Sequence, residues 1–445
     1  MPRAYVYGGE LWILIFSSVN EPLFGYIMAA SRGYRRHLSA ISVGGALLAL
    51  ASCLPYFPLW SVRSSTFALG AHFVVSVYLY DALLAYVSLA HASLLADITS
   101  VPAERERCNL YSSVMGALGC SCVFVAQLCW RGTDLQQFQF FVVALALCAI
   151  LAFVAASKLC ERATGVSKKR DDLLSSGANG VVVNYGEFSS SGRLPIRLFL
   201  RQVRKQTNLW LFSGINFIQV LNCHFNSNFL PIFVRAFCAF APPIVGSLVL
   251  GLSASLPHAT VALLTGVVAR KGAVFVVRVI IAVRLALAAA CLLALQPLAT
   301  AIVAAGDAPP PAAPNLLALS LGAAFFLVMN KMLGEAVCRH SNLILSDVID
   351  EDAVCNGRRG TESTLIHGLS FFVSKPGQSI APMLAMAILG DAPADSDLYR
   401  WRLFYMMCCV PLACTLVQTV LWLRYDLVGA RLAAVRKRTT SRLLL

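Results

Sequence analysis

Charged residues are scarce in this chain of 445 residues, because Asp, Glu, Lys and Arg together make up only 13% of it. Hydrophobic residues make up 58%, whereas soluble domains are usually about half apolar and about a quarter charged. The excess of apolar side chains needs lipid around it. Many apolar runs have the roughly 20 residues that a helix needs to cross a bilayer, which predicts an all-α polytopic membrane protein. The alternation typical of a transmembrane β-barrel strand is missing.

Motifs of soluble enzymes are missing too. No glycine-rich phosphate loop follows a strand pattern, and the 15 cysteines show no zinc-ligand spacing. We therefore expect no enzyme, no metal site and no cofactor, and we interpret most cysteines as small buried apolar side chains. The net charge of +14 comes from basic residues in alternate loops. The positive-inside rule explains this pattern, so we expect no nucleic-acid partner.

The apolar runs divide into eleven expected spans. Basic connectors such as SRGYRRH, ERER and NGRR alternate with nearly uncharged ones, which places the basic loops and the C-terminus in the cytoplasm and the N-terminus outside. No retention signal is visible, so we expect a multi-pass protein of the plasma membrane with the lipid bilayer as its main partner. The spans are 11–30, 38–56, 67–95, 110–130, 138–159, 209–229, 243–268, 274–295, 316–345, 365–389 and 403–423.

The spans form two halves. A charged segment rich in Ser and Gly, 160–208, is a predicted cytoplasmic linker between five spans in 1–159 and six in 209–424, and 425–445 is a basic tail. Within the linker, RLPIRLFLRQVRKQ is either an amphipathic helix on the anionic inner leaflet or a solvated loop. Two pairs of similar stretches recur in the halves, as in transporters built from parallel repeats. One helix is then missing ahead of the first five, by truncation, a late start or loss.

Three charged residues lie midway along three different spans. These are Glu21, Asp81 and Lys375, and a carboxylate near the bilayer centre costs roughly 2.5–3.5 kcal/mol on insertion scales. We expect the opposite charges to meet in one cavity. A carboxylate that lacks a cation there takes up a proton, so the site could couple to H⁺ or Na⁺. Pro22 and Pro376 suit helices that bend beside such a cavity.

Further candidates have a functional and a structural interpretation. Lys331 and Glu335, four apart on one helix face, form either a neutralising intramembrane pair or part of a site. Ser88, His224 and Asn226 are candidate solute ligands, with helix packing and interhelical hydrogen bonds as the alternative. The last group are candidate inner-gate residues, for which a topogenic or solvated role is the alternative: Asp97, Arg105, Arg107, Asp350, Arg358 and Arg359.

Several of these stretches resemble a known family. NEPLFGY followed by RGYRR resembles the second-helix signature of the glycoside–pentoside–hexuronide cation symporters, a branch of the major facilitator superfamily. SDVIDEDAVCNGRRG and FFVSKPGQSIAP resemble that family's loop between helices ten and eleven and its helix-eleven lysine. CHFNSNF, DVIDED and SKPGQSIAP resemble more narrowly the transmembrane protein 180 family, a eukaryotic offshoot. The resemblance spans nearly the whole chain and implies the major facilitator fold, with about eleven of its twelve helices and with alternating access.

The resemblance also implies roles for single residues. Glu21 matches the family's cation-binding aspartate, Asp81 its sugar-binding aspartate, and Lys375 the lysine beside the cation site. Ser17 stands where the family has a second cation-binding carboxylate, and the first helix, with another sugar-binding aspartate, has no counterpart. These departures weaken sodium coupling and sugar binding. They favour a proton at a single carboxylate beside a lysine.

Three functions follow from this sequence. The first is a secondary transporter, which carries out cation- or proton-coupled symport of a small, sugar-like solute by alternating access. The second is a transport-inactive membrane protein that acts as a scaffold or receptor for a protein partner, which Ser17 and the missing helix support. The third is a lipid transporter, which would need a lateral opening and an apolar cavity.

Overall fold

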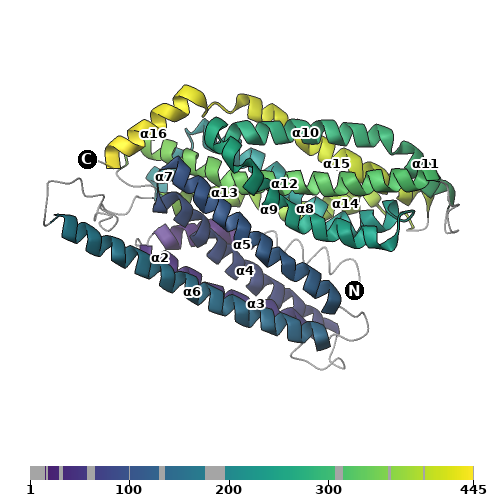
Figure 1. Cartoon of the computed structure of the whole chain (residues 1–445), viewed down its shortest axis with the longest axis horizontal. Helices are drawn as coiled ribbons and strands as arrows, with labels where there is room; N and C mark the ends of the chain where they lie inside the picture. The colour runs from purple at the N-terminus through teal and green to yellow at the C-terminus, as the bar shows by residue number, and fades with distance from the viewer. Residues whose placement is uncertain are drawn as a thin grey trace.

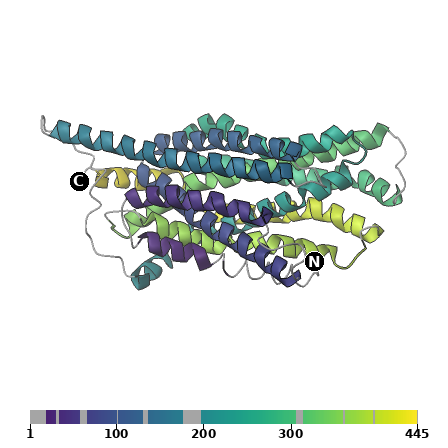
Figure 2. The same cartoon turned by 90° about the horizontal axis from the view of Figure 1, so that it is seen from below.

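The protein is helical throughout the residues that its computed structural model describes, and no β-strand occurs among them (Figure 1). This confirms the expected all-α class. The helices run roughly along the long axis of the molecule (Figure 2). The described residues are 16, 19–29, 34–57, 66–99, 101–129, 136–175, 196–305, 314–358, 362–393 and 396–443.

The helices form two bundles, which follow the two halves expected from the sequence (Figure 1). The N-terminal bundle begins with the helical segment 19–29. Its other elements are α2 (Tyr34–Ser39), the π-helical turn η1 (Ala40–Gly44), α3 (Gly45–Cys53), the short 3₁₀ helix η2 (Leu54–Tyr56), α4 (Thr66–Ile98), α5 (Pro102–Cys129) and α6 (Gln136–Ser175).

The C-terminal bundle is the larger one. The short α7 and the terminal α16 lie together at the end of the molecule where the C-terminus is found (Figure 1). The elements are α7 (Ile196–Val203), α8 (Thr207–Phe237), α9 (Pro243–Lys271), α10 (Ala273–Ala294), α11 (Gln296–Ala305), α12 (Pro314–Cys355), α13 (Ser363–Ser374), α14 (Pro376–Leu389), α15 (Asp397–Arg424) and α16 (Gly429–Leu443).

Seven helical stretches among the described residues are long and apolar enough to cross a membrane. The other four expected spans are helical as well: segment 19–29, α5, α8 and the α13–α14 pair. The helix α12 runs on to Cys355, beyond the expected span 316–345. The acidic run DVIDED continues the helix, since its carboxylates find cations and amides around them. Two more predicted polar segments are partly helical, since α6 reaches Ser175 and the basic tail forms α16.

The two bundles approach each other closely at small residues. Segment 19–29 crosses α13 at Gly25 and Gly368, where an added Cβ would lie 2.9 Å from the Thr364 carbonyl oxygen and 3.0 Å from the Glu21 carbonyl oxygen, respectively. Small residues let helix backbones touch within a membrane. On the other side of the interface, Gly116 of α5 leaves room for the ring of His258 in α9. Glu21 is thereby placed directly at the junction of the halves.

Candidate functional site

Lys375 contacts both intramembrane carboxylates that the sequence pointed to. Its Nζ lies 3.3 Å from Glu21 Oε1 and 3.1 Å from Asp81 Oδ2. Glu21 is 4% exposed and Asp81 8%, so these ion pairs are screened little by water. The three side chains come from segment 19–29, from α4 and from the junction of α13 and α14. The structure therefore brings residues of both halves into one buried charged cluster.

Local sequence explains why Lys375 stands there. Pro376 has no backbone N–H, so the hydrogen-bond ladder of the helix is interrupted between α13 and α14. Gly377 then lets α14 press against α8, because an added Cβ would lie 2.8 Å from the Phe217 carbonyl oxygen and 2.9 Å from the Leu221 nitrogen. This close packing of α14 on α8 fixes the position of Lys375 along the long axis of the bundle.

The charges of this cluster are unequal, because two carboxylates share one ammonium group. Glu21 Oε2 is buried and accepts no hydrogen bond from the described residues. An unsatisfied buried oxygen is costly, and a proton or a small cation at this atom would remove the cost. The geometry thus offers a site for one further positive charge beside Lys375.

Polar groups of α8 and α12 extend this charged region. His224 of α8 lies within electrostatic range of four charged side chains: Asp81, Lys375, Lys331 and Glu335. Lys331 Nζ lies 3.1 Å from Glu335 Oε1, so the i,i+4 pair predicted from the sequence forms. His224 is therefore near charges of both clusters. This position is compatible with solute binding and with packing, and its role stays a prediction.

Two other candidate solute ligands have different surroundings. The Asn226 side-chain amide donates to Asn222 Oδ1 and accepts from Asn330 Nδ2, both at 3.0 Å. The second of these hydrogen bonds joins α8 to α12, which is the structural alternative for this residue. Ser88 is exposed on α4, two turns from Asp81. Solute binding by either side chain stays a prediction, and Ser17 lies outside the described residues.

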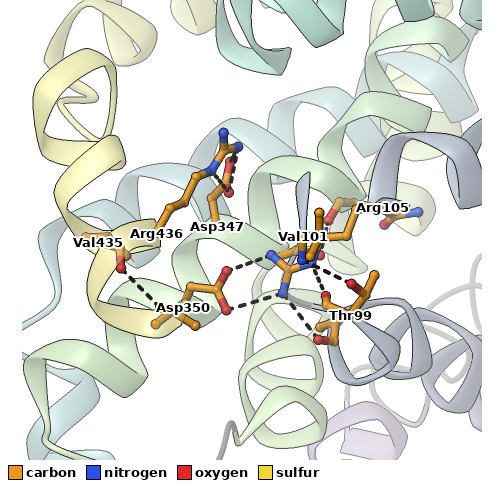
Figure 3. A network of polar contacts seen from close by, with 11 residues as sticks. Thr99, Val101, Arg105, Asp347, Asp350, Val435 and Arg436 are labelled. Atoms are coloured by element: carbon orange, nitrogen blue, oxygen red, sulfur yellow. Dashed lines mark hydrogen bonds and ion pairs between the residues drawn. The ribbon is translucent and has the colours of Figure 1, made fainter. Parts of the chain in front are cut away.

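A second buried ion pair, between Arg105 and Asp350, joins the two halves (Figure 3). Arg105 of α5 donates to Asp350 of α12 at 2.6 and 3.3 Å. Its Nε also donates to the Thr99 carbonyl oxygen at 2.7 Å, and Nη2 to that of Ala96 at 3.2 Å. The backbone of the α4–α5 turn therefore aims the guanidinium at α12.

The other described gate candidates form no ion pair between the two halves. Arg358 pairs with Asp352 and donates to Gln202 of α7 at 2.6 Å, so it ties α12 to α7 within the C-terminal half. Arg107 is exposed and forms no ion pair in the part of the chain that the structure describes. The side chain of Asp97 and all of Arg359 lie outside the described part. Only Arg105 and Asp350, of the described gate candidates, link the two halves by an ion pair.

The sequence interpretation missed the partners of the acidic run in α12. Asp347 pairs with Arg436 at 3.0 Å, and Glu351 with Arg431 at 2.6 Å, both from α16 (Figure 3 shows the first pair). Opposite charges in DVIDED and in the basic tail were the available signal, but nothing in the sequence placed them side by side. Glu106 of α5 lies near the same network, and its burial raises its pKa, which the charge of Arg436 partly opposes.

A buried arginine in α10 was missed as well. Arg284 is 1% exposed and donates to Asn330 Oδ1 at 3.3 Å, while its Nε and Nη1 have no hydrogen-bond partner among the described residues. An arginine inside the apolar run VFVVRVIIAVRLALAAACLLA was a visible signal. It points to a polar interior of the C-terminal bundle.

Comparisons with known proteins agree with this architecture. No family model matches the chain. Two curated relatives, both called transmembrane protein 180, are each 28% identical to it: one from Gallus gallus over 467 residues and one from Mus musculus over 478. Each match covers 96% of this chain and 86% of the relative. The chain is thus similar to these proteins over almost its whole length.

Solved structures with the same fold are transporters of the major facilitator superfamily. A bacterial homologue of the iron transporter ferroportin, in an outward-facing state with soaked iron, matches with a TM-score of 0.61 at 12% identity, covering 94% of this chain and 89% of that one. The transporter FucP in an outward conformation matches with 0.53 at 13% identity and the same coverage. The proton:xylose symporter XylE matches with 0.51 at 12%, covering 94% and 86%. The chain has the major facilitator fold, as its sequence predicted.

Proposed function

We propose that this protein is a secondary transporter that moves a small solute together with a proton by alternating access. The observation that carries the proposal is the position of Lys375, which contacts Glu21 and Asp81 at the junction of the two halves. Ionisable residues within transmembrane segments are rare, and those that face the interior mark ion and substrate pathways. The major facilitator fold supplies the two halves that can rock about such a site.

The unsatisfied oxygen of Glu21 is the proposed proton site. Protonation of Glu21 weakens its attraction to Lys375, which leaves the ammonium group to Asp81 and frees the contact between segment 19–29 and α13. A solute with hydroxyl groups would then exchange hydrogen bonds with Asp81. Sodium coupling is the less favoured variant, since Na⁺ prefers several oxygen ligands. The sugar-like solute and the place among cation symporters rest on the sequence resemblance.

The Arg105–Asp350 pair is the proposed inner gate. It joins the halves at the end that carries the basic loops, and the positive-inside rule places this end in the cytoplasm. With the gate ion pair formed, that end is closed, and the solute site opens to the other side. We propose the plasma membrane as its location. An epitope tag after Leu443 that binds antibody only in permeabilised cells would support this orientation.

Uptake into proteoliposomes tests the proposal. Purified protein is reconstituted with an inward proton gradient and screened against labelled sugars, organic acids and lysolipids. Uptake that collapses with a protonophore and is lost in Glu21→Gln supports proton-coupled transport, with Asp397→Asn, at an exposed carboxylate far along the chain, as the matched control. Uptake that ignores the gradient would contradict coupling, and binding of a protein partner without any uptake would favour a scaffold.

A further inference from the structure

Two thiols and a carboxylate converge inside the C-terminal bundle, on facing turns of α8 and α12. The sulfurs of Cys223 and Cys338 lie 3.1 Å apart. The carboxylate of Glu335 and both sulfurs all lie within 4.8 Å of one another, and each of the three residues is partly accessible. In the described part of the chain this is the one group of three such ligands. The buried pair Cys291 and Cys408, with sulfurs 3.7 Å apart, has no such carboxylate.

The side chain of Gln219 presents a donor to both sulfurs. Its Nε2 lies 3.1 Å from Cys223 Sγ and 3.4 Å from Cys338 Sγ, and it also donates to the Gly334 carbonyl oxygen at 2.7 Å. The orientation of this amide is fixed, because its Oε1 accepts a hydrogen bond from Gln418 at 2.7 Å. A fixed N–H donor stabilises a sulfur that carries negative charge.

Arg284 supplies the positive charge that such sulfurs need. Its guanidinium lies against Gly334, where an added Cβ would be 3.5 Å from Nη2. No carboxylate pairs with it among the described residues, and two of its nitrogens have no hydrogen-bond partner there. The thiols of Cys223, Cys338 and Cys414 lie within electrostatic range of this guanidinium. A buried cation without a counter-charge is costly, so a thiolate formed at Cys223 or Cys338 when a metal displaces its proton would be stabilised by Arg284.

We propose that Cys223, Cys338 and Glu335 bind a divalent thiophilic metal ion of the Zn²⁺ class. Two S–H bonds break, two metal–sulfur bonds form and two protons leave, so the total charge of the site does not change. Sulfurs at about 2.3 Å from a tetrahedral zinc ion lie about 3.8 Å apart. The two thiols therefore need to separate by less than about 1 Å, which side-chain rotation provides.

The third ligand can turn to the metal while its present partner keeps one of its two contacts. Glu335 pairs with Lys331, whose Nζ also donates to Ser227 Oγ at 2.7 Å. Lys331 keeps that hydrogen bond when Glu335 turns to the metal. Three protein ligands leave the fourth position open, which is typical of exchangeable sites and unlike the closed shells of structural zinc. The inference does not depend on transport activity.

Metal binding by the purified full-length chain tests this site. Reduced, metal-free protein is dialysed against Zn²⁺, and bound zinc is counted by mass spectrometry, with Cd²⁺–thiolate absorption as a second readout. We expect one zinc per chain, with affinity that rises with pH because two protons are released. Cys223→Ser or Cys338→Ser should weaken binding at least about tenfold. Cys291→Ser and Cys408→Ser, at the pair without a carboxylate, are the matched controls and should bind as the wild type does.

Cysteine alkylation of the wild-type protein tests the site without requiring that any variant folds. Alkylation followed by peptide mass spectrometry should show that Zn²⁺ protects Cys223 and Cys338 and that a chelator restores their labelling. Labelling of the partly accessible Cys120, next to His258, should not change. Equal zinc binding by all variants would mean an adventitious ion only and would overturn the proposal. Unchanged labelling of Cys223 and Cys338 in saturating Zn²⁺ would overturn it as well.

Discussion

Arg105 of α5 and Asp350 of α12 form a two-bond ion pair between the halves of the molecule, and both side chains are almost fully buried, at 3% and 2% exposure. Their residues are 245 positions apart in the chain. When such a pair opens, each charge must either reach water or find a new partner, because a buried ion that loses its partner keeps its desolvation cost. This relationship is the reason why we propose the pair as the inner gate.

Arg105→Ala should therefore weaken the contact between the halves. Loss of one partner of a buried pair costs about 3–5 kcal/mol, and we expect a lower thermal midpoint and faster hydrogen exchange at the α4–α5 turn. Arg107→Ala, at the exposed neighbour, is the control and should change the free energy of unfolding by less than about 0.5 kcal/mol. The exchanged pair Arg105→Asp with Asp350→Arg should recover part of the loss. Equal effects of Arg105→Ala and Arg107→Ala would contradict the gate.

Gly25→Ala should separate segment 19–29 from α13. The added Cβ would meet the Thr364 carbonyl oxygen at 2.9 Å, and backbone cannot yield as a flexible side chain does, so we expect a loss of about 1–3 kcal/mol. Gly119→Ala in α5 is the matched control, since its Cβ meets nothing within 4 Å. That variant should gain up to about 1 kcal/mol from helix propensity. Thermal unfolding in one detergent compares the two, and a neutral Gly25→Ala would count against close packing here.

The attachment of α16 to α12 should depend on salt. Arg431 and Arg436 are half- to one-third exposed, whereas Glu351 and Asp347 are buried, so water and ions screen the pairs. Arg436→Ala should free α16 and cost about 1–3 kcal/mol, because it removes this partner from the buried Asp347 carboxylate. Hydrogen exchange of α16 should rise in this variant and in high salt for the wild type. An α16 that exchanges equally in all these conditions would show that apolar contacts hold it.

Lys375→Ala should make the stability of the protein depend on pH. Without the ammonium group, Glu21 and Asp81 face each other as like charges, and one of them must take up a proton to stay buried. A proton that the folded state binds more tightly than the unfolded state stabilises at low pH and is lost as pH rises. The variant should therefore lose stability relative to the wild type as pH increases, and a constant difference across pH would contradict the contact. Lys331→Ala, at the neighbouring pair, is the control for loss of an intramembrane lysine.

Much of the fold could be predicted from the sequence, because apolar runs of membrane length determine helices almost alone. The charged cluster could be anticipated as well, since Glu21, Asp81 and Lys375 stand out in apolar surroundings. Pairings across the chain could not, because they depend on which helices become neighbours. Cys223 and Cys338 illustrate this: 115 residues separate them, so no ligand spacing shows in the sequence. The helix formed by the basic tail was missed for the same reason, since its partner is an acidic turn far away.

Thermal unfolding of the wild type and of Glu21→Gln across pH, with and without Na⁺, tests whether Glu21 is the coupling site. We predict that acidification stabilises the wild type, because a proton satisfies Glu21 Oε2, and that Glu21→Gln does not show this stabilisation. A response to Na⁺ that is lost in the variant would assign the coupling ion as sodium. Identical pH and Na⁺ responses of the two proteins would contradict a coupling site at Glu21.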